Sequence, residues 1–246
     1  MGTLYKIWAI AQIYGRWMIK SKLFYLYLTV FLPLTLVIPI RVLAYGKLYP
    51  YLTTGTIVFT ITMNALTTAN QDIATDKVFK RAALIITRPI TSTTYFLGLL
   101  LSNAMQIIPA TIMVISILNF ITVFRVQNWI LFLISMAMGW YTSVLLGFII
   151  GVTVGTRNYQ LTILIGNISS FILSFLAPVY YPMEALPVPL RYLALLLFTT
   201  HVANLINLSY ELESSLGCFP SLLYLVILMS ILTIFILPKV KLKDFY

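Results

Sequence analysis

The chain has 246 residues, of which 61% are hydrophobic and 9% are charged, and its mean hydropathy is +0.98. Soluble domains contain about half apolar and about a quarter charged residues, so this composition excludes a water-soluble globular protein and predicts a membrane protein. The formal charge of +10 does not indicate nucleic-acid binding, because the cations flank the apolar stretches and form no separate basic domain.

Residues 1–22 predict an amphipathic helix in the membrane interface. At 100° per residue, one face is mostly apolar and the opposite face is polar. The apolar face contains Leu4, Ile7, Ile10, Ala11, Tyr14, Trp17 and Met18, and the polar face contains Lys6, Gln12, Arg16 and Lys20. Aromatic residues opposite cations are typical of a helix that lies in the interface. An ordinary leader into the first span is the alternative.

Six apolar stretches are long enough to cross a bilayer, which takes about 20 helical residues. They cover residues 23–45, 51–70, 95–124, 129–156, 161–181 and 219–238. A further apolar run, residues 190–208, is interrupted by polar residues and follows a proline cluster. We expect short re-entrant or interfacial helices there, within an extracytoplasmic segment of residues 182–210. The predicted fold is all-α, a single polytopic membrane domain of residues 1–246.

The cations predict the orientation of these spans. With six spans both termini share one side of the membrane, together with Lys6, Arg16, Lys20, Lys22, Lys77, Lys80, Arg81, Arg88, Arg157, Lys239, Lys241 and Lys243. Only Arg41, Lys47, Arg125 and Arg191 fall on the other side. Because cytoplasmic loops are enriched in Lys and Arg, we predict a multi-pass protein of the cell (plasma) membrane with both termini in the cytoplasm.

Polar residues within the spans predict either a pathway or helix packing. In the second span, residues recur every three or four positions at Thr53, Thr56, Thr60, Asn64 and Thr67. Such a stripe can line a path or bond a neighbouring helix, and threonine can also bond its own helix backbone. The fifth span adds uncharged polar residues. The candidate pathway-lining residues are Thr56, Thr60, Asn64, Asn167, Ser170 and Tyr181.

The fourth span carries a column of small residues, four positions apart. It consists of Gly139, Ser143, Gly147, Gly151 and Gly155. Small residues at this spacing let another helix approach closely, so the column predicts helix packing.

Catalytic and metal-binding motifs are absent. The sequence has one cysteine, Cys218, one histidine, His201, and neither a phosphate-binding loop nor a His-Glu-x-x-His motif. We expect no catalytic, metal or cofactor site. All six acidic residues are predicted in loops or the tail, whereas ion-driven carriers use carboxylates near the middle of the membrane.

Two segments carry a family resemblance. Residues 76–102 read DKVFKRAALIITRPITSTTYFLGLLLS, and residues 177–192 read APVYYPMEALPVPLRY. They resemble permease subunits of type-2 ABC exporters, which move polysaccharides, drugs and lipids. In the first segment Asp76, Lys77, Pro89, Ile90, Thr91 and Gly98 match the family, whereas Lys80 replaces a usual Gly. In the second, Pro178, Tyr181, Pro182, Leu186, Pro187, Leu190 and Arg191 match, whereas residues 197–199 depart from the family's Leu-Asn-Pro.

The resemblance implies a non-catalytic subunit of an ATP-driven export complex. Its partners would be cytoplasmic ABC ATPase subunits, a second permease copy and membrane lipid, and its substrate an amphipathic drug, lipid or glycan. It also makes residues 71–94 a cytoplasmic coupling loop, with ATPase-docking residues Asp76, Lys77, Val78, Phe79, Lys80 and Arg81. Both charge signs beside apolar residues favour docking over a merely solvated loop. The alternative is an ATP-independent membrane carrier or a membrane-embedded assembly factor.

Overall fold

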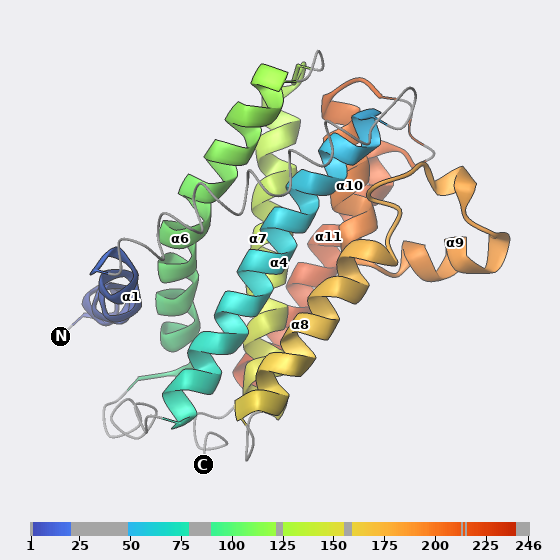
Figure 1. The fold of residues 1–246 in the computed structure, drawn as a ribbon. Helices are drawn as coiled ribbons and strands as arrows, with labels where there is room; N and C mark the ends of the chain where they lie inside the picture. The colour runs from blue at the N-terminus through green and yellow to red at the C-terminus, as the bar shows by residue number, and fades with distance from the viewer. Residues whose placement is uncertain are drawn as a thin grey trace.

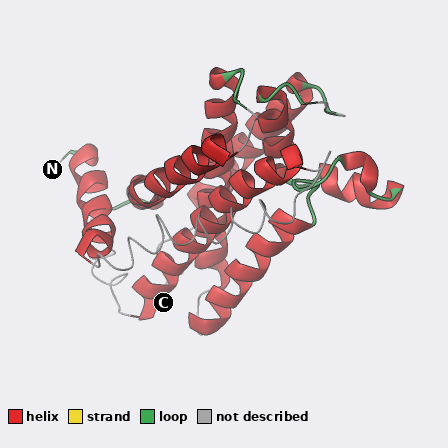
Figure 2. Cartoon of the chain, turned by 45° about the horizontal axis from the view of Figure 1, so that its top comes forward, coloured by secondary structure: helices red, strands yellow, loops and turns green. Residues whose placement is uncertain are grey.

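A computed structural model describes residues 2–20, 49–78, 90–121, 125–154, 159–212, 214 and 216–239. Within these ranges the chain forms helices joined by turns, without any strand, as the all-α prediction requires. Figure 2 shows this helical architecture. The first predicted span, residues 23–45, lies outside the described residues.

Long helices run side by side and one helix crosses them (Figure 1). The bundle contains α4 (Tyr49–Val78), α6 (Ser92–Ile121), α7 (Trp129–Val154), α8 (Tyr159–Phe175) and α11 (Cys218–Ser230). A π-helical segment, Ile231–Ile236, and a 3₁₀ turn, Leu237–Lys239, extend α11. The N-terminal helix α1 (Thr3–Lys20) is seen almost end-on beside α6, so it lies across the bundle. A 3₁₀ turn, Met183–Ala185, and the short helices α9 (Val188–Leu195) and α10 (Phe198–Ser209) complete the described elements.

Three helices among the described residues are long and apolar enough to cross a membrane. Their crossing segments are Ser92–Phe120, Trp129–Val154 and Cys218–Phe235. They correspond to the third, fourth and sixth predicted spans, and only the first and last of them begin earlier than predicted, by three residues and one residue. The pair α9 and α10 makes a fourth if it counts as one span, although its two helices meet at 91°. The structure therefore shows an all-helical chain with three or four candidate spans.

The two remaining predicted spans differ from the helices observed. Helix α4 covers the second span and continues to Val78, but its threonines and asparagines lower its hydropathy. Helix α8 has 17 residues and ends at Phe175, so the predicted fifth span extends too far. The residues after it form turns around Pro178, because proline lacks a backbone N–H and disfavours helix at the residue before it.

The column of small residues on α7 faces two different helices. A Cβ atom on Gly147 would lie 2.3 Å from the backbone oxygen of Leu66, so α4 packs directly on α7 at this point. A Cβ on Gly151 would lie 3.0 Å from the Ile73 side chain of the same helix. Gly139 instead meets Val202 of α10. Small residues thus bring both α4 and α10 into close contact with α7.

Two further predicted packing residues have different outcomes. Ser143 is buried, and its hydroxyl donates to the Gly139 carbonyl at 2.7 Å, so it leaves no hydroxyl to be paired elsewhere. Gly155 lies outside the described residues.

At the break between α9 and α10, three successive carbonyls each accept a hydrogen bond from a side chain. Thr200 donates to Ala194 O at 2.6 Å, His201 Nε2 to Leu195 O at 2.9 Å, and Tyr224 of α11 to Leu196 O at 2.5 Å. Unpaired backbone groups are costly away from water. These side chains therefore allow a 91° bend beside the buried helix α10.

Candidate functional site

The predicted docking residues begin in the last turns of α4 rather than in a loop. Helix α4 ends at Val78, so residues 71–78 of the predicted coupling loop are helical, and the expectation that Asp72 and Asp76 lie in a loop is wrong. The helix extends beyond its apolar stretch because Ile73 and Ala74 are buried, and Ile73 packs at Gly151 of α7. Val78 is 52% exposed. The other predicted docking residues, Phe79, Lys80 and Arg81, lie outside the described residues.

Asp76 joins three helices through its side chain. It is fully buried, and its Oδ2 atom accepts hydrogen bonds from the hydroxyls of Tyr14 on α1 and Tyr95 on α6, the latter at 2.5 Å. The two tyrosine oxygens lie 3.3 Å apart. All three side chains are buried, so this base cluster (Tyr14, Asp76 and Tyr95) is a buried polar contact between distant parts of the chain.

The environment keeps Tyr14 a hydrogen-bond donor. Burial raises the pKa of Tyr14 well above its ordinary value, and the nearby carboxylate of Asp76 raises this pKa further. Both effects disfavour a phenolate, because a buried negative charge loses hydration and meets another negative charge. Tyr14 is therefore protonated across the physiological pH range.

Lys77 ties α4 to α7. Its Nζ atom donates to the carbonyls of Gly151 and Val152, both at 3.0 Å. These carbonyls lie in the last turn of α7, where a cation also interacts favourably with the helix dipole. Of the predicted docking residues that are described, Asp76 and Lys77 thus direct their polar groups into the protein.

Helix α1 packs on α6 through a close approach at Gly98. A Cβ atom there would lie 2.5 Å from a methyl carbon of Ile10, so a larger residue would displace α1. Ile10, Ala11 and Tyr14 of the predicted apolar face are buried, whereas Leu4 is 83% exposed. Among the described side chains of that face, burial is therefore complete between Ile10 and Tyr14 and absent at Leu4.

The polar stripe of α4 is satisfied mainly within its own helix. Thr60 donates to the Thr56 carbonyl at 2.7 Å, and Thr56 donates to the Leu52 carbonyl at 2.8 Å. Ser170 of α8 bonds the Gly166 carbonyl in the same way, at 2.9 Å. All three donors are buried, so the geometry favours packing over pathway lining within one chain.

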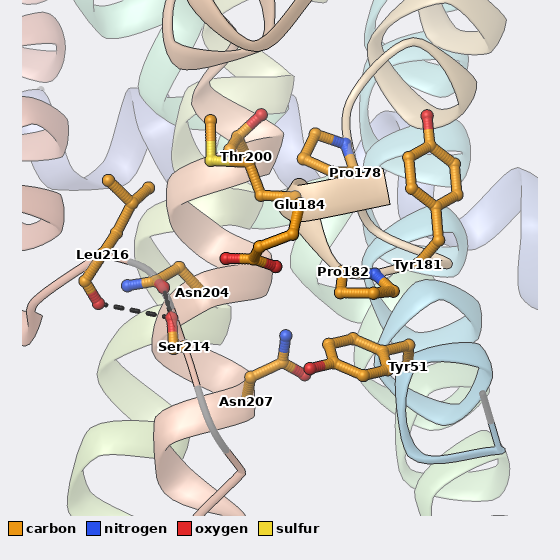
Figure 3. Close-up of a pocket in the computed structure, with 11 residues that line it drawn as sticks. Tyr51, Pro178, Tyr181, Pro182, Glu184, Thr200, Asn204, Asn207, Ser214 and Leu216 are labelled. Atoms are coloured by element: carbon orange, nitrogen blue, oxygen red, sulfur yellow. Dashed lines mark hydrogen bonds between the residues drawn. The ribbon is translucent and has the colours of Figure 1, made fainter. Parts of the chain in front are cut away.

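The other three predicted pathway residues lie in different surroundings. Asn64 and Asn167 are partly buried on α4 and α8. Tyr181 lines a polar pocket together with residues from the start of α4 and from α10 (Figure 3). The structure does not collect the six predicted residues in one place.

The polar pocket is small and surrounded by hydrogen-bonding groups. Glu184 points toward Asn204 and Ser214, while Tyr51 and Tyr181 stand on the other side (Figure 3). The Ser214 hydroxyl contacts both the Asn204 side-chain oxygen and the Leu216 carbonyl. The volume of the pocket, about 30 Å³, has room for water molecules but not for a glycan or a drug.

A row of aromatic rings that was not predicted from the sequence runs along α8. Phe171 and Phe175 stack at 5.8 Å, and Phe175 and Tyr180 stack at 5.5 Å. Phe59 of α4 lies 5.6 Å from Phe175. Gly55 of α4 leaves the space that the Tyr180 ring occupies. The spacing of four between Phe171 and Phe175 was the available signal, since such residues share a helix face.

These outer rings are available to a partner or ligand. Phe171 is 47% exposed and Phe175 is 53% exposed. Exposed rings on a membrane helix contact lipid, a neighbouring subunit or an apolar ligand. The aromatic row is therefore a candidate binding surface.

An apolar groove of about 420 Å³ lies between α4, α6 and α7. Its lining is almost entirely apolar, with isoleucine as the commonest residue, and only the side chains of Thr111 and Trp140 carry a nitrogen or oxygen atom. The volume falls within the range of small-molecule sites, but such sites also need a few placed polar groups. Trp140 already donates to Asn103 at 2.8 Å, so it offers no free donor to a ligand.

The described residues contain no group of three or more His, Cys, Asp or Glu side chains that could hold a metal ion. His201 stacks on Tyr224 with ring centres 4.0 Å apart. It bonds the carbonyl of Leu195, which gives it a structural role at the helix break.

Comparison with known proteins gives no relative from which to transfer a function: no protein-family model matches the chain, and no curated protein matches it.

Proposed function

We propose that this protein is the membrane-spanning permease subunit of an ATP-driven ABC exporter. In this proposal two permeases form the pathway, two cytoplasmic ATPase subunits supply the energy, and an amphipathic drug, lipid or glycan leaves the cytoplasm. The proposed topology has six spans, with both termini in the cytoplasm. The starting point is the resemblance of residues 76–102 and 177–192 to type-2 permeases.

The main structural support is the arrangement of the two elements that are not simple spans. Helix α1 lies across the bundle beside the first half of α6, and the broken pair α9 and α10 lies toward the other end (Figure 1). The resemblance implies both an interfacial N-terminal helix and short helices before the last span. The ends of α4 and α7 and the start of α6, which the cation pattern assigns to the cytoplasm, lie together at the α1 end.

The surfaces of the single chain suit a pathway that is completed by a second copy. Its polar pocket has room only for water-sized molecules, and its polar stripe is largely paired within α4. The exposed aromatic row on α8 offers an apolar and polarizable surface. Two such rows facing each other would line a path for a molecule with an apolar part.

The buried carboxylate of Asp76 is the observation that favours the alternative function, an ATP-independent carrier, so its position in the helix must be considered. Ion-coupled carriers place such groups near the middle of the membrane. Asp76 lies two residues before the end of a 30-residue helix, which at 1.5 Å per residue is roughly 20 Å from the helix centre. Its position near the helix end supports a structural or coupling role over ion transport.

The deciding experiment is reconstitution of this chain with a cytoplasmic ABC ATPase that is identified by co-purification. We expect co-purification of two permease and two ATPase subunits, and export that requires ATP. An ATPase variant that lacks its phosphate-binding lysine is the control and should abolish export. Export that follows an ion gradient without ATP would instead establish the carrier.

A further inference from the structure

The base cluster links α1 to α4 where few other contacts do. Helix α1 packs along α6, whereas Tyr14 reaches past α6 to Asp76 of α4. Tyr95 adds the bond from α6 to the same carboxylate oxygen. Loss of the Tyr14 hydroxyl therefore removes a link between α1 and α4 but leaves the apolar contact of α1 with α6 in place.

The position of the cluster in the chain relates this link to movements of the end of α4. Asp76 lies two residues before the end of α4, so it precedes the segment that joins α4 to α6. Lys77, the next residue, bonds two carbonyls at the end of α7. Successive side chains thus connect the end of α4 to α1 and α6 in one direction and to α7 in the other.

We propose that Tyr14, Asp76 and Tyr95 form a latch that makes α1, α4 and α6 move together when an ATPase acts on the segment after α4. The proposal rests on the proposed function for the source of that motion. Tyr14 and Tyr95 are positioning residues: they touch neither nucleotide nor substrate, and their hydroxyls fix the carboxylate and hold α1 in register. A broken latch lets the end of α4 move without α1.

The first variant is Tyr14→Phe, which keeps the ring and removes the hydroxyl. One hydrogen bond to a charged group contributes about 1.5 kcal/mol, so the docked population of α1 should fall roughly tenfold relative to the undocked one. We expect ATPase binding to persist and transport per ATP hydrolysed to fall by a similar factor. Tyr5→Phe is the matched control, because Tyr5 lies on the same helix and is 58% exposed.

A second measurement follows the latch without any transport. In a protein with Cys218→Ser, a cysteine placed by Ala11→Cys lies on the buried face of α1. Its labelling by a thiol reagent should be slow with Tyr14 present and about tenfold faster with Tyr14→Phe, by the same hydrogen-bond energy. Unchanged labelling would show that no latch exists.

Rescue separates coupling from simple stability. In a protein with Cys218→Ser, the further changes Tyr14→Cys and Asp76→Cys let a short bifunctional thiol reagent replace the hydrogen bond with a covalent bridge. Transport per ATP should be low before bridging and recover after it. Fast labelling at position 11 with normal coupling would overturn the proposal, as would a bridge that restores docking but not coupling. If even the wild type binds no ATPase, the proposed function fails and the coupling role fails with it, while labelling still reports whether the latch exists.

Discussion

At the base of the bundle the buried polar group is a side chain, Asp76, whose partners come from α1 and α6. At the opposite end the groups that need partners are backbone carbonyls, and side chains of α10 and α11 donate hydrogen bonds to them. The base partners are 62 and 19 residues away from Asp76 in sequence, whereas two of the three carbonyl bonds span six residues. The far end is therefore largely stabilised locally, and the base depends on helices that must first come together.

This difference predicts that one substitution at Asp76 weakens the packing of several helices, whereas one substitution at the helix break affects only a local turn. A carboxylate shared by two donors is a hub, so its removal affects every helix that it joins. A carbonyl at a helix break affects one peptide group, and a neighbouring donor can compensate. The three predictions below test that contrast.

The largest effect is expected for Asp76→Ala. Two buried hydroxyls lose their acceptor, but at 3.3 Å one can donate to the other, so about one donor remains unpaired. We expect a loss of about 2 kcal/mol in unfolding free energy, measured by denaturant titration in detergent. Glu184→Ala is the control, since Glu184 is exposed and its loss should stay within about 0.5 kcal/mol. Equal effects of the two variants would contradict a hub at the base.

A smaller effect is expected at the helix break for Thr200→Val. The variant keeps the shape of the side chain and removes its bond to Ala194 O, but that carbonyl also accepts the Leu197 N–H at 3.0 Å. The loss should be about 1 kcal/mol in the same titration. Thr153→Val, at an exposed threonine that bonds its own helix, should change little. If Thr200→Val costs more than Asp76→Ala, then the far end is the less tolerant region.

Hydrophobic length and spacing predict much of the fold. Three predicted spans correspond to helices able to cross a membrane. A long apolar stretch in lipid must pair its own backbone N–H and C=O groups, and a helix pairs them within one segment. The spacing of Gly147 and Gly151 marks the face on which α4 packs, since steric room depends on residue size alone. Polar residues and prolines after α8 mark the region of short helices.

The candidate site is less predictable because its contacts are tertiary. Nothing local in the sequence joins Tyr14 to Asp76, and a charged residue beyond an apolar stretch is ordinarily placed in a loop. The placement failed because burial of Ile73 and Ala74 continues α4 past its apolar segment. Likewise, the sequence allows Thr56 either to line a path or to bond its own helix backbone, and the three-dimensional structure shows the bond to the Leu52 carbonyl.

The smallest effect, absent at neutral pH, is expected from alkaline titration of the base cluster. The pKa of Tyr14 is raised above its ordinary value of 10.0, first by burial and then by the charge of Asp76. A raised pKa means that the docked state holds its proton more tightly than the undocked state. The contribution of Tyr14 to docking is therefore complete below about pH 10 and is lost as the pH rises above it. The surrounding titratable groups are Asp72 and Asp76 of α4 and Tyr95 of α6.

A spin label on α1 can follow this titration. In a protein with Cys218→Ser, Trp8→Cys places the label at a position that is 48% exposed. The label is attached at neutral pH, and its mobility is then measured from about pH 7 to pH 11.5, a range that brackets the ordinary tyrosine pKa. We expect constant mobility up to about pH 10 and a reversible increase above it. With Tyr14→Phe the mobility should be higher throughout, and the alkaline step should shrink. An alkaline step of undiminished size in that variant would assign the transition to another group. The hydrogen bond from Tyr14 to the carboxylate of Asp76 would then not be the contact that makes the docking of α1 depend on pH.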